Sequence, residues 1–241
     1  MTVRALVFDA YGTLYDVQSV RRLATELCGD KGELVTQLWR LKQLEYTWLR
    51  GLMRDYADFW QVTGESLDFA LAAAGATLAP AARDRLMAKY LDLDLYPEAR
   101  AALDALRGQK LAILSNGSPR MLEDLVAASG IAPLLAEIIS VDLAKTYKPD
   151  PACYALVEPR LGVSRGEVLF VSSNGFDVAG AKTFGFRVAW IERGGGAAPP
   201  VSSAVGPAEF YRLLRGRAET LARAADFRIG ALTDLPNVVS K

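Results

Sequence analysis

The 241-residue sequence predicts an α/β fold, a Rossmann-like doubly wound parallel sheet core with an inserted helical cap subdomain. Three observations lead to this prediction. Short apolar runs recur along the chain, and several of them end on polar or acidic residues. After about residue 95 these runs alternate with helical segments, which is typical of a parallel sheet. Between the first run and the second, the chain carries only helical periodicity.

The first strand is predicted over residues 3–8. Its unbroken apolar run is typical of a central parallel strand that is covered on both faces. The run ends on Asp9, and Gly12 and Thr13 follow in a turn. In open α/β sheets, ligands bind beyond the carboxyl ends of the strands. We therefore expect Asp9 in a functional site, next to turn N–H groups that can bind an anion.

The segment after this turn is predicted to be the cap. Helical patterns cover 18–28, 32–52, 55–75 and 80–93, and glycine-containing breaks separate them. In the second segment, Leu34, Leu38, Leu41, Leu44 and Trp48 recur every three to four residues, so one helix face should be buried. We assign residues 16–94 to the helical cap and residues 1–15 and 95–241 to the core domain.

The rest of the core is predicted to alternate between strands and helices. Strands are expected at 109–114, 136–141, 167–172, 186–191 and 226–231. Helices are expected at 98–107, 119–129, 151–161, 176–184 and 207–223, with a loop at 194–206. Ser118 and Pro119 are good helix starters and Gly130 a good helix end. This alternation implies right-handed crossovers between parallel strands.

The charge balance and the cysteine content limit the possible partners and the cellular compartment of the protein. Lys and Arg number 28 and so do Asp and Glu, so we expect no nucleic-acid partner and no membrane partner. No apolar run reaches the roughly 18 residues of a membrane span, and the N-terminus lacks a signal-peptide layout. Cys28 and Cys153 lie far apart and are expected to be free thiols. We therefore predict a cytoplasmic protein.

Histidine is absent from the sequence. This excludes a Ser-His-Asp hydrolase, a histidine-ligated zinc site and a histidine general base. An enzyme with this sequence has to use carboxylates, lysine, arginine and hydroxyl groups for its acid–base chemistry.

Polar side chains at four strand ends are expected to converge on one crevice. They are Asp9, the pair Ser115-Asn116, Lys148, and the stretch 172–174 with Asp177. An Asp-x-x-Gly-Thr motif followed by Ser-Asn, Lys-Pro and an acidic turn resembles the haloacid dehalogenase superfamily. The resemblance covers nearly the whole chain, and the four motifs together are specific.

Two departures separate this sequence from the phosphatases of that superfamily. Tyr11 stands where the phosphatases carry a second aspartate, and Ser172-Ser173 stands where they carry a Gly-Asp pair that holds Mg²⁺. Asp9 and Asp177 alone are a poor cage for Mg²⁺, which prefers octahedral oxygen coordination. A Mg²⁺-dependent small-molecule phosphatase remains one alternative. A non-catalytic binding protein, whose role would survive Asp9→Asn, is another.

The sequence is similar to the L-2-haloacid dehalogenase branch in four segments. These are residues 39–49, 115–117, 148–149 with Tyr154, and 171–177. The resemblance implies hydrolysis of short L-2-haloalkanoic acids to D-2-hydroxy acids and halide, with inversion. It also implies an ester intermediate on Asp9 and no metal or other cofactor.

The resemblance further implies the site residues. Asp9 would be the nucleophile, Arg40 the cation on the halide side, and Asp177 the base for ester hydrolysis. The implied catalytic residues are Asp9, Thr13, Arg40, Ser115, Lys148, Tyr154, Ser172, Asn174 and Asp177. The implied substrate-binding residues are Ala10, Tyr11, Arg40, Leu44, Phe59, Ser115, Asn116 and Phe176, with Trp60 as an alternative to Phe59.

Elementary chemistry agrees with these implied roles. An aspartate is ionised at neutral pH, with a reference pKa of about 3.9, and can displace a halide to form an ester. The leaving halide needs no proton, so no acid is required at position 11. It does need positive charge, and a cation about 4 Å away contributes roughly 4 kcal/mol at an effective dielectric of about 20.

The predicted helix 207–223 is expected to form a homodimer interface. It carries Phe210, Leu213, Leu214 and Leu221 on a charged background. Apolar side chains on such a helix need a partner surface. We expect analytical ultracentrifugation at micromolar concentration to give a dimer. A monomer under these conditions would contradict the prediction.

Overall fold

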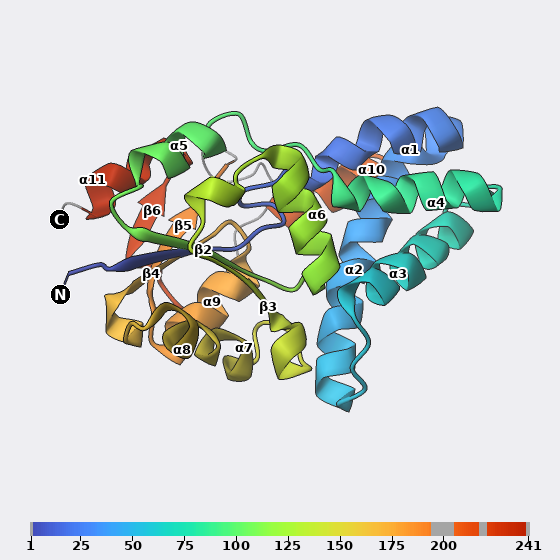
Figure 1. Ribbon diagram of the computed structural model, residues 1–241. Coiled ribbons are helices and arrows are strands. Elements are labelled where there is room, and N and C mark those ends of the chain that lie inside the picture. Colours follow the sequence, from blue (N-terminus) through green and yellow to red (C-terminus); the bar gives the residue numbers. More distant parts are fainter. Residues whose placement is uncertain (1, 194–204, 217–220, 240–241) are drawn as a thin grey trace.

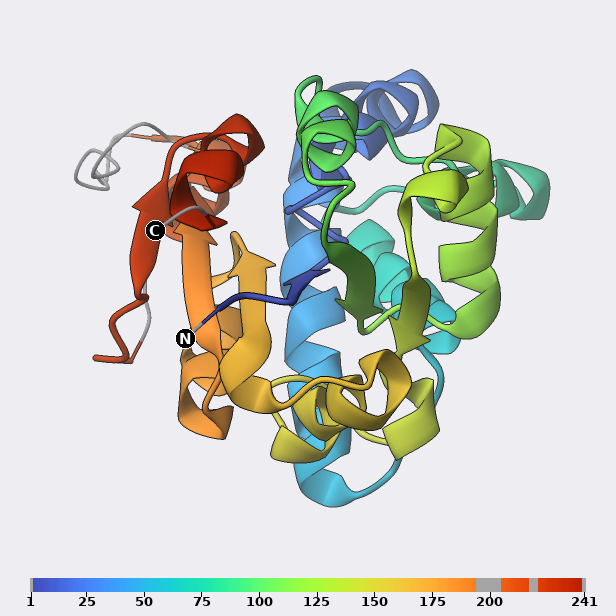
Figure 2. The same cartoon turned by 60° about the vertical axis from the view of Figure 1, so that its left-hand side comes forward.

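The computed structural model describes residues 2–193, 205–216 and 221–239, which contain a six-stranded parallel sheet (Figure 1). The strand order is β3-β2-β1-β4-β5-β6, which can be followed in Figure 2. All five neighbouring pairs are parallel, which confirms the predicted fold class. The strands are β1 (Ala5–Phe8), β2 (Lys110–Ser115), β3 (Glu137–Ser140), β4 (Val168–Ser172), β5 (Arg187–Ile191) and β6 (Phe227–Ile229).

Strand β1 is central in the sheet and fully buried. It pairs with β2 on one side and β4 on the other. Its four residues, all apolar, have no exposed surface, as expected for a strand covered on both faces. The backbone N–H of Asp9 donates to the carbonyl of Val171 at 2.9 Å. Asp9 therefore emerges at the carboxyl end of the sheet, between β1 and β4.

Helices cover both faces of the sheet, as the predicted doubly wound arrangement requires (Figure 1). One layer holds α5, α6 and α11, and the other holds α7, α8 and α9. These helices are α5 (Ala99–Ala105), α6 (Pro119–Ser129), α7 (Pro151–Ala155), α8 (Val157–Leu161), α9 (Gly175–Phe184) and α11 (Leu235–Val239). As predicted, Pro119 opens α6 and Gly130 ends it in a left-handed conformation with φ of 67°.

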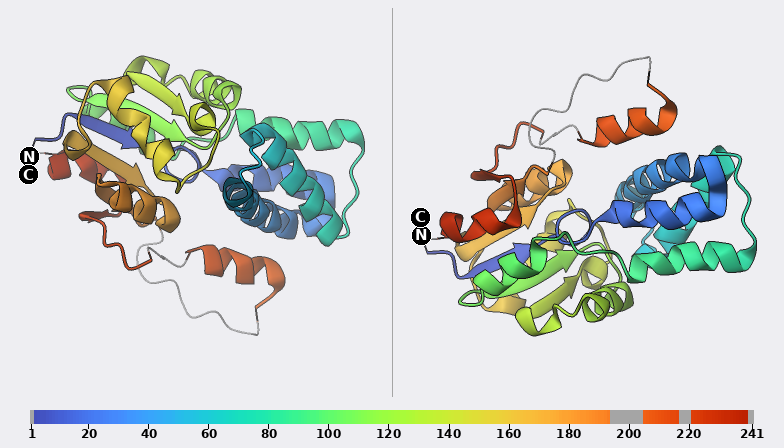
Figure 3. Two further views of the ribbon diagram at one scale, coloured as in Figure 1. Left: turned by 90° about the horizontal axis from the view of Figure 1, so that it is seen from below. Right: turned by 90° about the horizontal axis from the view of Figure 1, so that it is seen from above.

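A helical lobe stands to one side of the sheet, between β1 and β2 in the chain (Figure 3). It contains α1 (Arg21–Cys28), α2 (Gly32–Met53), α3 (Phe59–Ala73) and α4 (Pro80–Ala88). Trp39 of α2 is fully buried inside it. The two connections to the sheet lie side by side, because Asp16 N–H donates to the carbonyl of Asp94 at 2.8 Å. Cap boundaries at 16 and 94 stay a prediction.

A second junction joins the lobe to the sheet domain through the loop between α2 and α3. The Tyr56 hydroxyl donates to Asp142 Oδ1 at 2.7 Å, and the Tyr147 hydroxyl donates to the carbonyl of Ala57. The rings of Tyr56 and Tyr147 lie 5.2 Å apart. This tyrosine junction immediately precedes Lys148 in the chain.

Four of the predicted helices begin, end or break at residues other than those predicted. The predicted helix 55–75 begins only at Phe59, because the Asp58 carboxylate accepts from the N–H of Gln61 and caps the first turn. The predicted helix 151–161 is two short helices, since Pro159 has no N–H to continue the ladder. The first and fourth cap helices each include a 3₁₀ turn, Val17–Val20 and Lys89–Leu91.

The predicted helix 207–223 is shorter than expected. Helix α10 (Pro207–Gly216) lies against α2 of the same chain. Leu221 and Ala222 have φ of 49° and 59°, so a single helix through residue 223 is wrong. Phe210 is 40% exposed, whereas the Leu214 side chain and residues 194–204 lie outside the described residues. A dimer interface at this helix stays a prediction.

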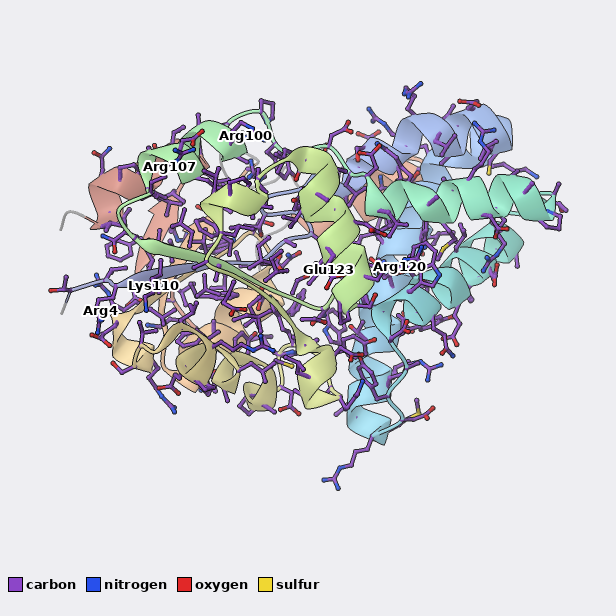
Figure 4. All side chains as sticks on the ribbon, viewed as in Figure 1. Arg4, Arg100, Arg107, Lys110, Arg120 and Glu123 are labelled. Carbon is purple, nitrogen blue, oxygen red and sulfur yellow. The ribbon has the colours of Figure 1, made fainter. Side chains whose placement is uncertain are left out.

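Charged side chains lie on the outside of the sheet domain. Figure 4 labels six of them, all exposed: Arg4, Arg100, Arg107, Lys110, Arg120 and Glu123. Both signs are present on this face, in keeping with the net charge of zero. In the described ranges, we find no helix with the length and apolar composition of a bilayer crossing.

Candidate active site

The carboxylate of Asp9 lies at the centre of a buried hydrogen-bond network. Its Oδ2 accepts from the Thr13 hydroxyl at 3.1 Å and from the Asn174 amide at 2.8 Å. Its Oδ1 accepts from the Lys148 ammonium at 3.1 Å. The residue is only 6% exposed. These donors fix the orientation of the carboxylate.

Lys148 is a buried cation held by two buried carboxylates. Its Nζ lies 3.1 Å from Asp9 Oδ1 and 3.0 Å from Asp177 Oδ2, and its side chain is 1% exposed. Burial alone would lower the pKa of the Lys148 ammonium, but Asp177 and Asp9 raise it above its ordinary value. The lysine is therefore protonated at neutral pH and balances part of the negative charge.

Tyr154 binds the carboxylate oxygen of Asp177 that Lys148 does not bind. The Tyr154 hydroxyl donates to Asp177 Oδ1 at 2.8 Å. Burial raises the pKa of Asp177 to about 6, although Lys148 opposes the shift. An aspartate with this pKa can exchange a proton near neutral pH, which a general base requires.

The loop between β4 and α9 connects this network to the turn after Asp9. The Ser172 hydroxyl accepts from the Asn174 N–H at 3.1 Å, which turns the Asn174 side chain towards Asp9. The Ser173 N–H donates to the Thr13 hydroxyl at 3.0 Å, and the Ser173 hydroxyl donates to the carbonyl of Gly12 at 2.8 Å. Ser173 was expected at the crevice but was not among the predicted catalytic or substrate-binding residues.

Arg40 reaches the site from the helical lobe. It lies on α2 and is 4% exposed. Its Nη1 donates to Gln43 Oε1 at 2.7 Å and its Nη2 to the carbonyl of Tyr11 at 3.3 Å. Gln43 was not predicted as a site residue. Its spacing of three residues from Arg40 places both on one helix face, which is the signal that the sequence offered.

A small cavity lies between the sheet domain and the helical lobe. Its volume is about 10 Å³, room for about one water molecule. Asp9 and Arg40 both line it. All of its lining residues belong to the predicted site: Asp9, Tyr11, Arg40, Leu44, Phe59, Asn116, Lys148, Asn174 and Phe176.

The apolar part of the cavity wall comes from both lobes. Phe59 lines the wall, whereas the alternative residue Trp60 is 37% exposed and does not. The rings of Tyr11 and Phe59 lie 5.4 Å apart. Burial raises the pKa of the Tyr11 hydroxyl, so this ring remains neutral. An uncharged wall of this kind fits an alkyl group.

Several predicted residues lie behind the cavity wall rather than in it. Ser115 is buried, and its hydroxyl accepts from the Gly117 N–H at 3.2 Å. The carbonyl of Ala10 accepts the N–H groups of the following turn. The remaining predicted residues outside the wall are Thr13, Tyr154, Ser172 and Asp177, which contact the lining residues or their loops.

A wider hollow of about 930 Å³ lies beside the cavity. The two share Arg40, Leu44, Lys148, Asn174 and Phe176. The ring of Phe176 packs edge-on against Trp48, with centroids 5.2 Å apart. The hollow therefore borders the site along α2 and the start of α9.

The acidic residues of the site do not fit a Mg²⁺ ion. Asp9 and Asp177 both bind the Lys148 ammonium, so this cation occupies the space between them. Position 173, where the superfamily phosphatases carry an acidic ligand, is a serine bound to a backbone carbonyl. In the part of the chain that the structure describes, no group of three acidic or cysteine side chains could hold a metal ion.

The site and the fold define a class of hydrolase. Residues 3–185 match the family model of the haloacid dehalogenase-like hydrolases. The chain belongs to this family of enzymes. Its parallel sheet with flanking helices is the fold expected from the motifs.

Relatives within the family show which of its branches the chain resembles. The chain is 49% identical over 240 residues to an (S)-2-haloacid dehalogenase from Xanthobacter autotrophicus, covering 98% of this chain and 95% of the relative. It is 48% identical over 197 residues to (S)-2-haloacid dehalogenase 4A from Burkholderia cepacia, covering 80% and 85%. The predicted resemblance to the L-2-haloacid dehalogenases is thereby confirmed.

Solved structures agree with the relatives. The structure of L-2-haloacid dehalogenase from Xanthobacter autotrophicus superimposes with a TM-score of 0.94 at 48% identity, covering 99% of both chains. A second structure of that enzyme, with the same TM-score and coverage, has chloropropionic acid covalently bound.

The packing of α9 against Tyr154 generates a testable prediction. A Cβ atom on Gly180 would lie 2.4 Å from the Tyr154 hydroxyl and 2.6 Å from Pro149 Cβ. We expect Gly180→Ala to lower the free energy of unfolding by about 1–3 kcal/mol through overpacking. This would exceed the gain of up to about 1 kcal/mol in helix propensity. Urea denaturation measures the change.

Gly108→Ala is the matched control, because no atom lies within 4 Å of its added Cβ. We expect this variant to stay within about 0.5 kcal/mol of the wild type, as other surface changes do. Equal stability of Gly180→Ala and the wild type would contradict the packing described above.

Proposed function

We propose that the protein hydrolyses short L-2-haloalkanoic acids to D-2-hydroxy acids and halide, as an (S)-2-haloacid dehalogenase. One observation carries the proposal. Asp9 and Arg40 line the same small cavity, and Tyr11, Leu44, Phe59 and Phe176 supply the apolar part of its wall. A carboxylate and a cation that face one partly apolar space suit the displacement of a halide. The names of the relatives agree with this chemistry.

In the first step, a carboxylate oxygen of Asp9 attacks C2 of the substrate. The carbon–halogen bond breaks, its electron pair leaves with the halide, and an ester joins Asp9 to C2. Tyr11, Leu44 and Phe59 would enclose the alkyl group. Attack from the side opposite the halogen inverts C2, so an L-substrate gives a D-product.

The leaving halide gains negative charge as the bond breaks. Arg40 would stabilise this charge, with Asn116 and Phe176 beside it in the same wall. A cation about 4 Å from the halide contributes roughly 4 kcal/mol at an effective dielectric of about 20. Only the part gained in the transition state accelerates the reaction, and about 1.36 kcal/mol corresponds to tenfold in rate.

The substrate carboxylate would be held on the sheet side of the cavity. Lys148 supplies positive charge in the wall, and the turn at Ala10 and Tyr11 supplies backbone N–H groups. Ser115 lies just behind the wall. Its hydroxyl is an acceptor towards the Gly117 N–H, so its own hydrogen can be donated to the substrate.

In the second step, water attacks the carbonyl carbon of the Asp9 ester. Asp177 would take the proton, while Lys148 and Asn174 hold the ester group in place. Support for this role comes from the raised pKa of Asp177 and from the ammonium that Asp177 shares with Asp9. Water must enter beside Lys148, because Asp177 lies behind the cavity wall. The 2-hydroxy acid then leaves with an oxygen that came from Asp9.

The proposal includes three further features of the protein. Catalysis needs no metal ion, because Lys148 supplies the charge between the two carboxylates. The active form is a homodimer that uses the helix beginning at Pro207. The enzyme works in the cytoplasm, where its two thiols stay reduced.

Halide release tests the proposed function. Incubation with L-2-chloropropionate in the presence of EDTA should release chloride and give D-lactate, and Asp9→Asn should release none. A single turnover in heavy-oxygen water should place the label in Asp9 rather than in the product. No halide from any short 2-haloacid would refute the proposal, and Mg²⁺-stimulated turnover of p-nitrophenyl phosphate would favour the phosphatase instead.

The pH profile tests Asp177 as the base. This carboxylate accepts a proton only when it is ionised, and its pKa is raised to about 6. Lowering the pH through this value protonates it, so ester hydrolysis should slow about tenfold per pH unit below the pKa. We expect kcat to be flat above about pH 7, and Asp177→Asn to accumulate the Asp9 ester, detectable by mass spectrometry. Unchanged hydrolysis in Asp177→Asn would contradict this role.

A further inference from the structure

We propose that Gln43 is a positioning residue for Arg40. Gln43 directs the Arg40 guanidinium into the cavity without neutralising its charge. The inference rests on the proposed function, in which Arg40 stabilises the leaving halide. It adds a residue of the helical lobe that does not line the cavity.

The surroundings of Arg40 are unusual for a buried cation. The two groups that accept its hydrogen bonds are uncharged: the amide oxygen of Gln43 at 2.7 Å and the carbonyl of Tyr11 at 3.3 Å. Among the described residues, no carboxylate lies within 4.0 Å of this guanidinium. A buried cation normally pairs with an anion. Arg40 therefore carries a charge at the cavity wall that no salt bridge with a described residue neutralises, and an anion that enters can reach it.

The amide of Gln43 is oriented by Thr63 on helix α3. The Thr63 hydroxyl donates its single hydrogen to the carbonyl of Phe59 at 2.6 Å. It can therefore only accept from Gln43, whose Nε2 lies 2.8 Å away. This bond turns Oε1 of Gln43 towards Arg40. The reverse orientation would place the amide NH₂ against a guanidinium, donor against donor.

The network is buried, so it resists rearrangement. Gln43 and Thr63 have no exposed surface. The Tyr90 hydroxyl points at the same Oε1 of Gln43 from 3.5 Å, and the Trp39 indole N–H donates to the carbonyl of Thr63 at 2.8 Å. Moving the Gln43 amide would leave buried donors or acceptors unpaired. The guanidinium is thereby held by helices α2 and α3 together.

The uncharged character of Gln43 has a chemical consequence. A carboxylate at this position would form a buried ion pair with Arg40 and draw its charge away from the cavity. A side chain of similar length without an oxygen acceptor would remove the shorter of the two hydrogen bonds of Arg40 and leave the one to the Tyr11 carbonyl. Glutamine provides an uncharged acceptor on a side chain long enough to reach Arg40, so halide binding should depend on it more than substrate-carboxylate binding does.

Two variants of Gln43 and one control test the inference. Gln43→Glu should lower kcat on L-2-chloropropionate on the order of 100-fold, as loss of a charge-stabilising group does. It should also weaken product inhibition by added bromide at least about tenfold, while KM changes less. Gln43→Met should act in the same direction to a smaller extent. Gln37→Met is the control, because Gln37 is also fully buried on α2 but its amide bonds to Gln18 and Glu33.

Bromide inhibition separates positioning from a structural role. A merely structural glutamine would lower the melting temperature in both Met variants and leave the bromide inhibition constant unchanged, which would overturn the inference. Unchanged kcat and bromide inhibition in Gln43→Glu would also overturn it. If the Gln43→Glu variant fails to fold, bromide inhibition of a Thr63→Val variant tests the inference in its place. Weaker bromide inhibition in that variant supports the inference, and unchanged inhibition refutes it.

Failure of the proposed function gives a different result. A folded wild-type protein that releases no halide from any 2-haloacid overturns the dehalogenase assignment and this inference with it. If the wild type is active and Gln43→Glu changes neither kcat nor bromide inhibition, only the role of Gln43 is overturned.

Discussion

The interaction on which the site depends is the buried ammonium of Lys148 between two carboxylates. Two aspartates this close and this buried would repel each other, and one of them would be protonated without a cation between them. Lys148 lies within 3.1 Å of Asp9 and 3.0 Å of Asp177. The three residues come from the end of β1, the loop after β3 and the start of α9. The parallel sheet brings these segments to one edge, so fold and charge balance are coupled.

The site also depends on a division of charge between the two lobes. The sheet domain holds Asp9 and its donors, whereas the helical lobe contributes Arg40. Asp9 is held within the sheet domain by Thr13 and Asn174. Arg40 is held by Gln43 of its own lobe and by the carbonyl of Tyr11 in the sheet domain. The cavity between them is thus polarised across the lobe boundary. This arrangement explains how a helical insertion can complete a site that begins in the sheet.

The sheet could be predicted from local patterns, whereas the residues of the cavity wall were predicted from the resemblance to the L-2-haloacid dehalogenases. Apolar runs mark buried strands such as β1, and the residues after them belong to short motifs. Helix ends were less predictable, since the cap at Asp58 and the break at Pro159 are single-residue effects. The roles of Gln43 and Ser173 were missed because their partners, Thr63 and Thr13, lie 20 and 160 positions away. Only packing brings such pairs together.

The size of the cavity has a kinetic consequence. A space that fits one water molecule cannot receive a molecule with a halogen, a carboxylate and an alkyl carbon. The cavity must therefore widen before such a molecule can bind, by movement of the side chains or of the lobes that form its wall. The apparent affinity for any substrate is then the intrinsic affinity multiplied by the open fraction. Substrate capture then depends on how often the cavity is open, as well as on the residues that touch the substrate.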